Sequence, residues 1–212
     1  MFTIRTLLEG KWALLILLAL TVATFIWCPW KWVPAVPLLL LAFTLSFFRD
    51  PTRTISADPR DIVSPADGKV TDIKTVHDPY YQKADTVMVG IFLSVFDVHV
   101  QRSPIAGTIK LVQYNKGKFL DARNPECSTL NENRVVGIEG ADGYRVTVKQ
   151  IAGLIAQRIV GWAGEGAKLE KGERIGMIRF GSRVELFLPP GTEVTVKVGQ
   201  HVEGGQVLAR RN

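Results

Sequence analysis

Two apolar segments near the start of the chain contrast with the sequence that follows them. Residues 12–30 read WALLILLALTVATFIWCPW and residues 33–48 read VPAVPLLLLAFTLSFF, with Lys31 the only charged residue from 12 to 48. A membrane-spanning helix needs about 20 apolar residues, so the first segment is long enough and the second is marginal. Prolines between the segments interrupt a helix, and tryptophans there suit a membrane–water interface. The pattern predicts a membrane-anchoring helical hairpin over residues 1–50.

Basic residues flank this hairpin on both outer sides. Arg5 and Lys11 precede it, and Arg49, Arg53 and Arg60 follow it. Because cytoplasmic flanks carry an excess of Lys and Arg, we expect both ends, and the domain that follows, on the cytoplasmic face of the cell membrane. A signal peptide is the alternative, but no small-residue cleavage site precedes the second segment, which would itself remain as an anchor. A shallow re-entrant hairpin and a true double span fit this pattern equally well.

From residue 60 onward the sequence changes to short runs rich in Val and Ile, separated by glycine-containing turns. Partial alternation of apolar and polar residues predicts β-strands, and one helix is predicted over Leu154–Val160. We therefore expect residues 51–212 to form a mainly β domain, barrel-like or sandwich-like. The predicted strands are Lys69–Thr75, Thr86–Leu93, Gly107–Tyr114, Arg134–Glu139, Tyr144–Ile151, Arg174–Ile178, Val184–Leu188 and Glu193–Val198.

Two short patterns recur within this β region. SPADGKV at 64–70 is similar to SPIAGTI at 103–109, and KLEKGERIGMI at 168–178 is similar to HVEGGQVLAR at 201–210. Such patterns occur where a chain turns tightly between strands, as in lipoyl-type carrier domains, although any compact β fold reuses such turns. The second pair predicts facing lipoyl-like hairpins on either side of residue 182.

Composition excludes several classes of function. The net charge of +6 is spread along the chain without a dense basic run, which favours an anionic lipid surface over nucleic acid as a partner. Cys28 and Cys127 are predicted to be free thiols. The three histidines, His77, His99 and His201, stand far apart, so no metal site is predicted.

The segment RIGMIRFGSRVELFLPPG, residues 174–191, places Gly181-Ser182 between two apolar strands. Alone, this is an ordinary turn. In this context the chain resembles the phosphatidylserine decarboxylases, in particular their short bacterial and archaeal form, over nearly its whole length. The motifs that carry the resemblance are FFRDPTR at 47–53, VSPADGKV at 63–70, FLSVFDVHVQRSPIAG at 92–107 and GMIRFGSRVELFLP at 176–189.

The resemblance implies a zymogen that cuts itself between Gly181 and Ser182, giving a β chain of residues 1–181 and an α chain of residues 182–212. Ser182 would become a pyruvoyl group, a covalent cofactor made from the chain itself. Its ketone would form a Schiff base with the amine of phosphatidylserine, acting as the electron sink while carbon dioxide leaves. The implied product is phosphatidylethanolamine, which makes the protein a carboxy-lyase of phospholipid biosynthesis.

Two further residues are candidates for catalysis. His99, in FDVHV, matches a family histidine in the same context. Longer family members carry a second histidine three residues later, within an Asp-His-Ser triad, and here that position is Arg102. His99 is therefore expected either to act as the base for self-cleavage or to serve only in substrate protonation. Asp67, in SPADG, matches the acidic family residue and would orient His99 or stabilise its cationic form.

Two other functions are compatible with the sequence. A membrane-anchored lipoyl-like carrier or adaptor would keep an intact chain and carry a modified lysine, for which Lys171 is the nearest candidate. A serine hydrolase would use Asp67, His99 and a free Ser182 hydroxyl. Exposed edges of a β domain also make a homo-oligomer plausible.

Overall fold

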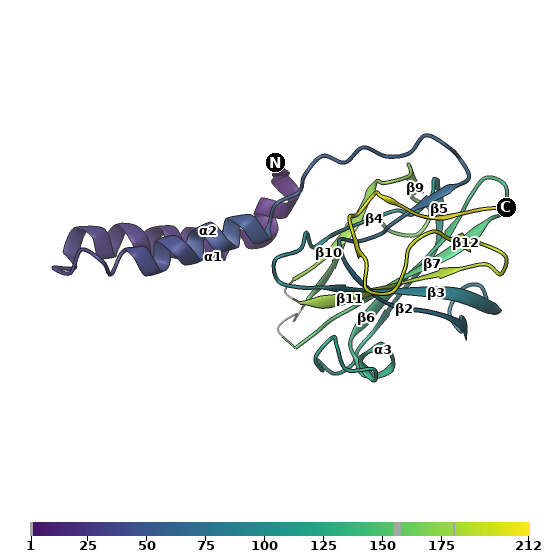
Figure 1. Cartoon of the computed structure of the whole chain (residues 1–212). Helices are drawn as coiled ribbons and strands as arrows, with labels where there is room; N and C mark the ends of the chain where they lie inside the picture. Colours follow the sequence, from purple (N-terminus) through teal and green to yellow (C-terminus); the bar gives the residue numbers. More distant parts are fainter. Residues whose placement is uncertain (1, 155–157, 180) are drawn as a thin grey trace. The chain divides into compact units, whose positions relative to one another are not determined.

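The computed structural model describes residues 2–154, 158–179 and 181–212. The chain divides into two compact units, Met1–Thr52 and Arg53–Asn212 (Figure 1). The first unit is helical and the second is built mainly from β-strands.

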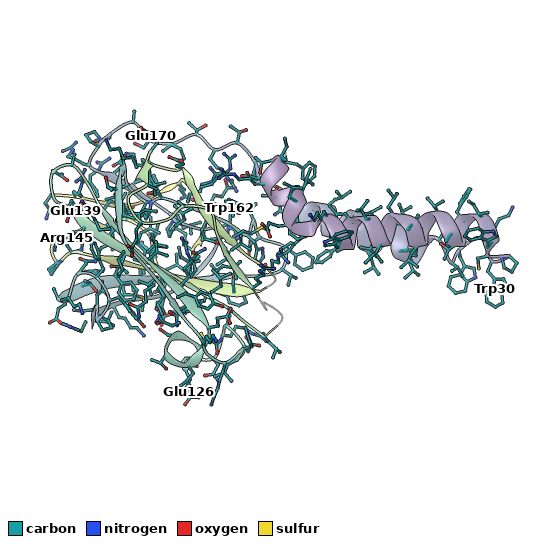
Figure 2. All side chains as sticks on the ribbon, turned by 180° about the vertical axis from the view of Figure 1, so that it is seen from behind. Trp30, Glu126, Glu139, Arg145, Trp162 and Glu170 are labelled. Atoms are coloured by element: carbon teal, nitrogen blue, oxygen red, sulfur yellow. The ribbon has the colours of Figure 1, made fainter. Side chains whose placement is uncertain are left out.

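The first unit is a helical hairpin. Helix α1 spans Ile4–Trp27 and helix α2 spans Ala35–Phe47. Thr3 caps α1, since its hydroxyl accepts a hydrogen bond from the Thr6 amide. Gly10 allows close packing, because a Cβ there would lie 2.5 Å from the Phe48 ring. Trp30 lies exposed in the turn between the helices (Figure 2).

Most side chains of α1 are exposed apolar groups, and only Thr6 and Gly10 are buried. Helix α1 has 24 residues, and an 18-residue window within it has a mean hydropathy of 1.8, so it is long and apolar enough to cross a membrane, whereas α2 has only 13 residues. The predicted helical hairpin is confirmed.

The second unit contains fourteen strands and one short helix, α3 (Cys127–Leu130), among the described residues. The strands are β1 (Asp61–Val63), β2 (Gly68–His77), β3 (Asp85–Leu93), β4 (Val100–Arg102), β5 (Gly107–Asn115), β6 (Asn133–Glu139), β7 (Arg145–Ile151), β8 (Ile159–Gly161), β9 (Lys168–Leu169), β10 (Arg174–Ile178), β11 (Ser182–Leu188), β12 (Glu193–Val194), β13 (His201–Val202) and β14 (Val207–Arg210).

Eight of these strands form one curled antiparallel sheet in the order β13-β2-β3-β11-β7-β6-β5-β9. Two three-stranded sheets, β1-β14-β12 and β4-β10-β8, pack with it around a core of Val, Ile and Leu side chains. Strand β11 lies in the middle of this sheet (Figure 1). Every residue of β11 is buried. The sheet therefore fixes the residue at the start of β11, which is Ser182.

The structure confirms a mainly β domain, and each of the eight predicted strands overlaps an observed one. The prediction over Glu193–Val198 was too long, because β12 pairs with β14 only through Glu193 and Val194. The predicted helix over Leu154–Val160 includes residues 155–157, which lie outside the described residues. At its end, Ile159 and Val160 belong to β8 and pair with β10, so this part of the prediction was wrong. Pairing with β10 suits these β-branched residues better than a helix does.

Candidate active site

Ser182 is the first residue of β11 and pairs with Leu93, the last residue of β3. Its side chain is fully buried, with 0% exposure. Its Oγ has no hydrogen-bond partner among the residues that the structure describes. A buried hydroxyl without a partner costs free energy, and such groups are found where a reaction requires them.

Gly181 adopts a left-handed backbone conformation, with φ of +49°. A Cβ on Gly181 would have no heavy atom within 4 Å, so glycine is required there by conformation and not by space. The carbonyl oxygen of Gly181 packs closely on Gly153, where a Cβ would lie 2.2 Å from that oxygen. Gly153 thus lies directly against the carbonyl that precedes Ser182.

His99 lies on the connection between β3 and β4. Its Nδ1 is 3.0 Å from the carbonyl oxygen of Asp97, and its own carbonyl accepts a hydrogen bond from Ile178 in β10. This second bond ties His99 to the strand that leads toward Gly181. The contacts described for His99 do not include Ser182, so the catalytic role of His99 stays a prediction.

Asp97 organises the same connection. One carboxylate oxygen accepts hydrogen bonds from the Ser94 amide and hydroxyl, both at 2.7 Å, and the other lies 2.8 Å from Nε2 of His201. Burial raises the pKa of Asp97, but these hydrogen bonds outweigh burial and leave the pKa below its usual value. The Asp97–His201 pair joins residues on opposite sides of the Gly181-Ser182 bond in the sequence.

Asp67 makes its described contacts with Arg53 and Gly204. Its carboxylate lies 2.5 Å from the Arg53 guanidinium and accepts a hydrogen bond of 2.8 Å from the Gly204 amide. Burial raises its pKa, although Gly204 and Arg53 oppose that effect. None of the contacts described for Asp67 is to His99, so an orienting or catalytic role for Asp67 stays a prediction.

Lys171, the lysine of the carrier alternative, donates hydrogen bonds to the backbone carbonyls of Asp58 and Asp61. A carrier lysine must instead project from a hairpin tip into solvent. The packing of Lys171 is therefore that of a structural residue.

A hollow of about 410 Å³ lies beside Gly181. Its lining residues come from the ends of β3 and β7 and from the loop before α3: Phe92, Ser94, Val95, Asp121, Ala122, Arg123, Leu154 and Gly181. A second hollow of about 620 Å³ shares Phe92, Ala122 and Arg123 with the first and includes Lys69 and Lys74. Gly181 therefore borders an open space between the segments that follow β3 and β7.

A sequence model of the family described as phosphatidylserine decarboxylase matches residues 40–210. Three curated relatives, each called a phosphatidylserine decarboxylase proenzyme, are similar to most of the chain. The relative from Solibacter usitatus is 51% identical over 84% of this chain and 83% of its own length. The relative from Carboxydothermus hydrogenoformans is 45% identical over 96% and 94%, and that from Burkholderia vietnamiensis 45% over 80% and 79%.

The chain belongs to the phosphatidylserine decarboxylase family. This confirms the family membership that the sequence motifs predicted. Among solved structures, glucose permease IIA from Mycoplasma capricolum is 12% identical, covers 70% of this chain and 93% of its own, and has a TM-score of 0.38. A similarity that low supports no conclusion about this member of the family.

Arg102 and Arg183 are both engaged in structural contacts. Arg102 donates a hydrogen bond to the Gly172 carbonyl. Arg183 lies 2.8 Å from Asp72 and 2.8 Å from Glu185, whose side chain is only 1% exposed. Burial lowers the pKa of Arg183, but the two carboxylates outweigh burial and raise it. Gly90 gives the guanidinium room, because a Cβ there would lie 2.3 Å from Arg183 Nη2.

Replacing Arg183 with methionine is expected to destabilise the domain by about 3–5 kcal/mol, because Glu185 would keep a buried charge without its cation. Equilibrium urea unfolding measures this loss. The double variant Arg183→Met/Glu185→Gln should recover part of it. Equal stability of the single and double variants would show that an unpaired Glu185 carboxylate costs no stability and would contradict this explanation.

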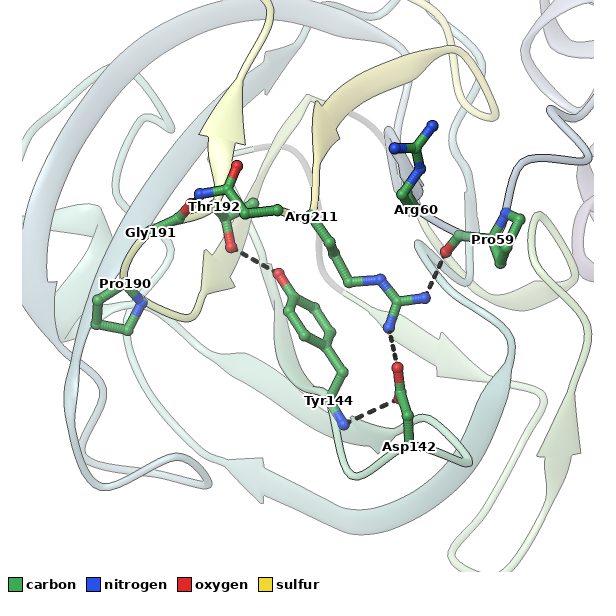
Figure 3. A pocket seen from close by; sticks show the side chains of 9 residues that line it. Pro59, Arg60, Asp142, Tyr144, Pro190, Gly191, Thr192 and Arg211 are labelled. Atoms are coloured by element: carbon green, nitrogen blue, oxygen red, sulfur yellow. Dashed lines mark hydrogen bonds and ion pairs between the residues drawn. The ribbon is translucent and has the colours of Figure 1, made fainter.

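A separate hollow of about 450 Å³ lies near the end of the chain, around Tyr144 (Figure 3). The Tyr144 hydroxyl lies 2.6 Å from the Thr192 hydroxyl, and Arg211 lies 2.6 Å from Asp142 and over the Tyr144 ring. These contacts attach residues 192–211 to the body of the sheet. None of the residues that line this hollow also lines the one beside Gly181.

Sequence reasoning did not identify Gly153, nor the pairing of Asp97 with His201. Gly153 occurs in a common Ala-Gly-Leu context, and the carbonyl that it contacts belongs to Gly181, 28 positions away along the chain. Asp97 and His201 are 104 positions apart. Only the folded sheet brings these residues together. Among the described residues, no group of three His, Cys, Asp or Glu side chains is placed to hold a metal ion.

Proposed function

We propose that this chain converts phosphatidylserine to phosphatidylethanolamine and carbon dioxide, using a pyruvoyl group that it makes from Ser182. Membership of the decarboxylase family supports the reaction, and the name proenzyme of the relatives supports a precursor that must be processed. One observation carries the assignment of the site: a fully buried Ser182 hydroxyl with no described hydrogen bond follows Gly181, whose backbone is left-handed.

Self-cleavage begins with attack of Ser182 Oγ on the carbonyl carbon of Gly181. The peptide C–N bond breaks, an ester forms, and the Ser182 nitrogen takes the proton from the hydroxyl. Removal of the Ser182 α-proton then breaks the Cβ–O bond, which leaves Gly181 as a carboxylate and residue 182 as dehydroalanine. Water hydrolyses the imine tautomer of dehydroalanine and releases ammonia. One water is consumed, one ammonia is released, and a ketone remains at the head of residues 182–212.

The two chains would stay together without a covalent bond. β11 is hydrogen-bonded to β3 on one side and β7 on the other, β13 pairs with β2, and β14 pairs with β1. Arg210 adds an ion pair to Asp61. The 31 residues after the cut therefore remain an integral part of the sheet.

A pyruvoyl group at residue 182 would supply an electrophilic ketone for the substrate amine and a sink for the electron pair released with carbon dioxide. Among the residues of the chain, His99 is our candidate for moving protons, since its Nδ1 is held by the Asp97 carbonyl and its backbone is held by β10. We assign the substrate head group to the hollow beside Gly181. Asp67, which Arg53 and Gly204 hold in place, remains our candidate for orienting His99 or stabilising its cationic form.

The N-terminal hairpin would attach the enzyme to the membrane that holds its substrate. The length and apolar composition of α1 support this role. The basic flanks favour placement of the catalytic domain on the cytoplasmic face. An anchored site meets its lipid substrate by diffusion within the membrane.

Intact-mass analysis of the purified protein, combined with hydroxylamine labelling, tests the proposal. We expect two chains, one that ends at Gly181 and one that begins at residue 182. The shorter chain should be lighter than a chain that begins with serine by the mass of the ammonia released when the ketone forms. Hydroxylamine should add to the shorter chain alone and abolish carbon dioxide release from phosphatidylserine. An active protein with one unbroken chain would overturn the pyruvoyl mechanism, and a serine-directed reagent that modifies Ser182 would favour a hydrolase.

A further inference from the structure

The proposed site lies at one end of β11, where both of its neighbouring strands also end. β3 and β7 run antiparallel to β11, so their last residues lie beside its first ones: Leu93 pairs with Ser182, and Ile151 pairs with Arg183. The chain segments that leave β3 and β7 therefore emerge on opposite sides of Ser182. Each segment exposes one large apolar side chain.

On the β3 side, residues 94–97 form a tight turn in which the Asp97 amide donates a 3.0 Å hydrogen bond to the Ser94 carbonyl. Phe96 lies in this turn and is 72% exposed. Turns usually carry Gly, Asn, Asp or Ser at such positions, so a large aromatic side chain that is mostly exposed there is unusual. The Asp97 contacts to Ser94 and His201 fix the turn, so Phe96 is held at the surface on a constrained backbone.

On the β7 side, Leu154 follows Gly153, the residue packed against the Gly181 carbonyl. Leu154 is 65% exposed and lines the hollow beside Gly181, as does Val95, the neighbour of Phe96. The two segments that carry Phe96 and Leu154 thus both border the hollow beside Gly181. We call these two side chains the apolar rim.

Charged groups near the rim are of both signs. Arg123 lines both hollows and is paired with Asp121 at 2.6 Å, and Lys74 lies 3.8 Å from Asp72. Lys69 adds a further positive charge in the second hollow. An apolar rim with a mixed but lysine- and arginine-containing border is typical of a surface that enters the head-group layer of a membrane. A surface that binds anionic lipid by charge alone would instead carry its basic residues without acidic partners such as Asp121 and Asp72.

We infer that the apolar rim, Phe96 and Leu154, inserts into the interfacial layer of a phospholipid bilayer and thereby brings the buried site to a lipid head group. This inference rests on the proposed function, because it assumes that the substrate lipid reacts at residue 182. It assigns the β domain a lipid contact of its own, separate from the N-terminal hairpin. Insertion of the rim would shorten the distance that a head group must travel out of the membrane plane to reach the site.

The test compares two forms of the same substrate with the full-length, self-cleaved protein. One is long-chain phosphatidylserine in vesicles with phosphatidylcholine, and the other is short-chain phosphatidylserine dissolved as monomers. For Phe96→Asp and Leu154→Asp, we expect the ratio of kcat/KM on vesicles to kcat/KM on monomers to fall at least about tenfold relative to the wild type. Phe96→Trp, which keeps an interfacial aromatic side chain, should retain the wild-type ratio.

Tyr114→Asp serves as the matched control, since Tyr114 is also a half-exposed aromatic residue but lies on β5, three strands away from β11. Its ratio should equal that of the wild type. Complete self-cleavage of every variant, measured by intact mass, verifies that each one folds.

An unchanged ratio in both rim variants would overturn the inference and leave the hairpin as the only lipid contact. An equal loss on vesicles and monomers in Phe96→Asp, whose residue does not line the hollow, would also overturn it, since that result marks Phe96 as part of the site itself. If the wild type decarboxylates neither substrate, the proposed function fails first. That outcome is distinct from a wild type that is active on both substrates and insensitive to the rim variants.

Discussion

Replacing Ser182 with alanine is expected to leave one continuous chain of 212 residues and to abolish decarboxylation. Alanine has no oxygen to attack the Gly181 carbonyl, so neither the ester nor the ketone forms. Loss of a residue that supplies the reactive group typically lowers the rate by at least about a thousandfold. Intact mass reports the unbroken chain, and release of carbon dioxide from phosphatidylserine reports activity.

The fold should survive this change. The Ser182 hydroxyl has no hydrogen bond among the described residues, so its removal leaves no polar group newly unpaired. We therefore expect a thermal unfolding midpoint equal to or above that of unprocessed wild-type protein. Ser182→Cys provides a graded control, because a thiol can make the same attack and should cleave slowly. Normal cleavage in Ser182→Ala would eliminate Ser182 as the origin of the ketone.

Gly153→Ala is expected to slow self-cleavage about a hundredfold, since small misplacements of reacting atoms cost this much. The new Cβ would lie 2.2 Å from the Gly181 carbonyl oxygen, far inside van der Waals contact. The obstructing atom is backbone, so relief requires movement of the very carbonyl that Ser182 must attack. The cleaved fraction over time, followed by denaturing electrophoresis after cell-free synthesis, measures the effect.

Gly164→Ala is the matched control for this experiment. A Cβ at Gly164 would meet no heavy atom within 4 Å, so the same substitution should leave cleavage unchanged. Far-ultraviolet circular dichroism distinguishes a misplaced carbonyl from general unfolding, because only the latter changes the β-sheet signal. Wild-type cleavage rates in Gly153→Ala would mean that the Gly181 carbonyl need not occupy its observed position.

Much of the fold could be predicted because its strands carry local signals. Alternation and β-branched residues located all the long strands of the large sheet, including β3, β7 and β11, and the apolar runs located the hairpin. Two-residue strands such as β9 and β13 were missed, because their pairing depends on partners far along the chain. The segment at Ile159 looked helical, but its pairing with β10 overrides local propensity.

The site was predicted in part for a similar reason. Gly181 and Ser182 are adjacent in sequence and a family motif surrounds them, so the amino-acid sequence alone is enough to identify them. The packing of Gly153 against the Gly181 carbonyl could not be predicted, since only the pairing of β7 with β11 brings these two residues together. For Asp67 the resemblance suggested a role beside His99, and that role stays a prediction; its contacts with Arg53 and Gly204 join residues far apart in the sequence and could not be predicted.

Full burial of Ser182 bears on the survival of the ketone that we propose to form there. An activated carbonyl in open water would be consumed by thiols, free amino acids and other small nucleophiles. A carbonyl at the start of a strand enclosed on both sides is shielded from such side reactions. Water-soluble serine has no acyl tail to keep it at the entrance. The same enclosure that hides the hydroxyl before processing would then help the mature protein to discriminate between a lipid amine and its soluble analogues.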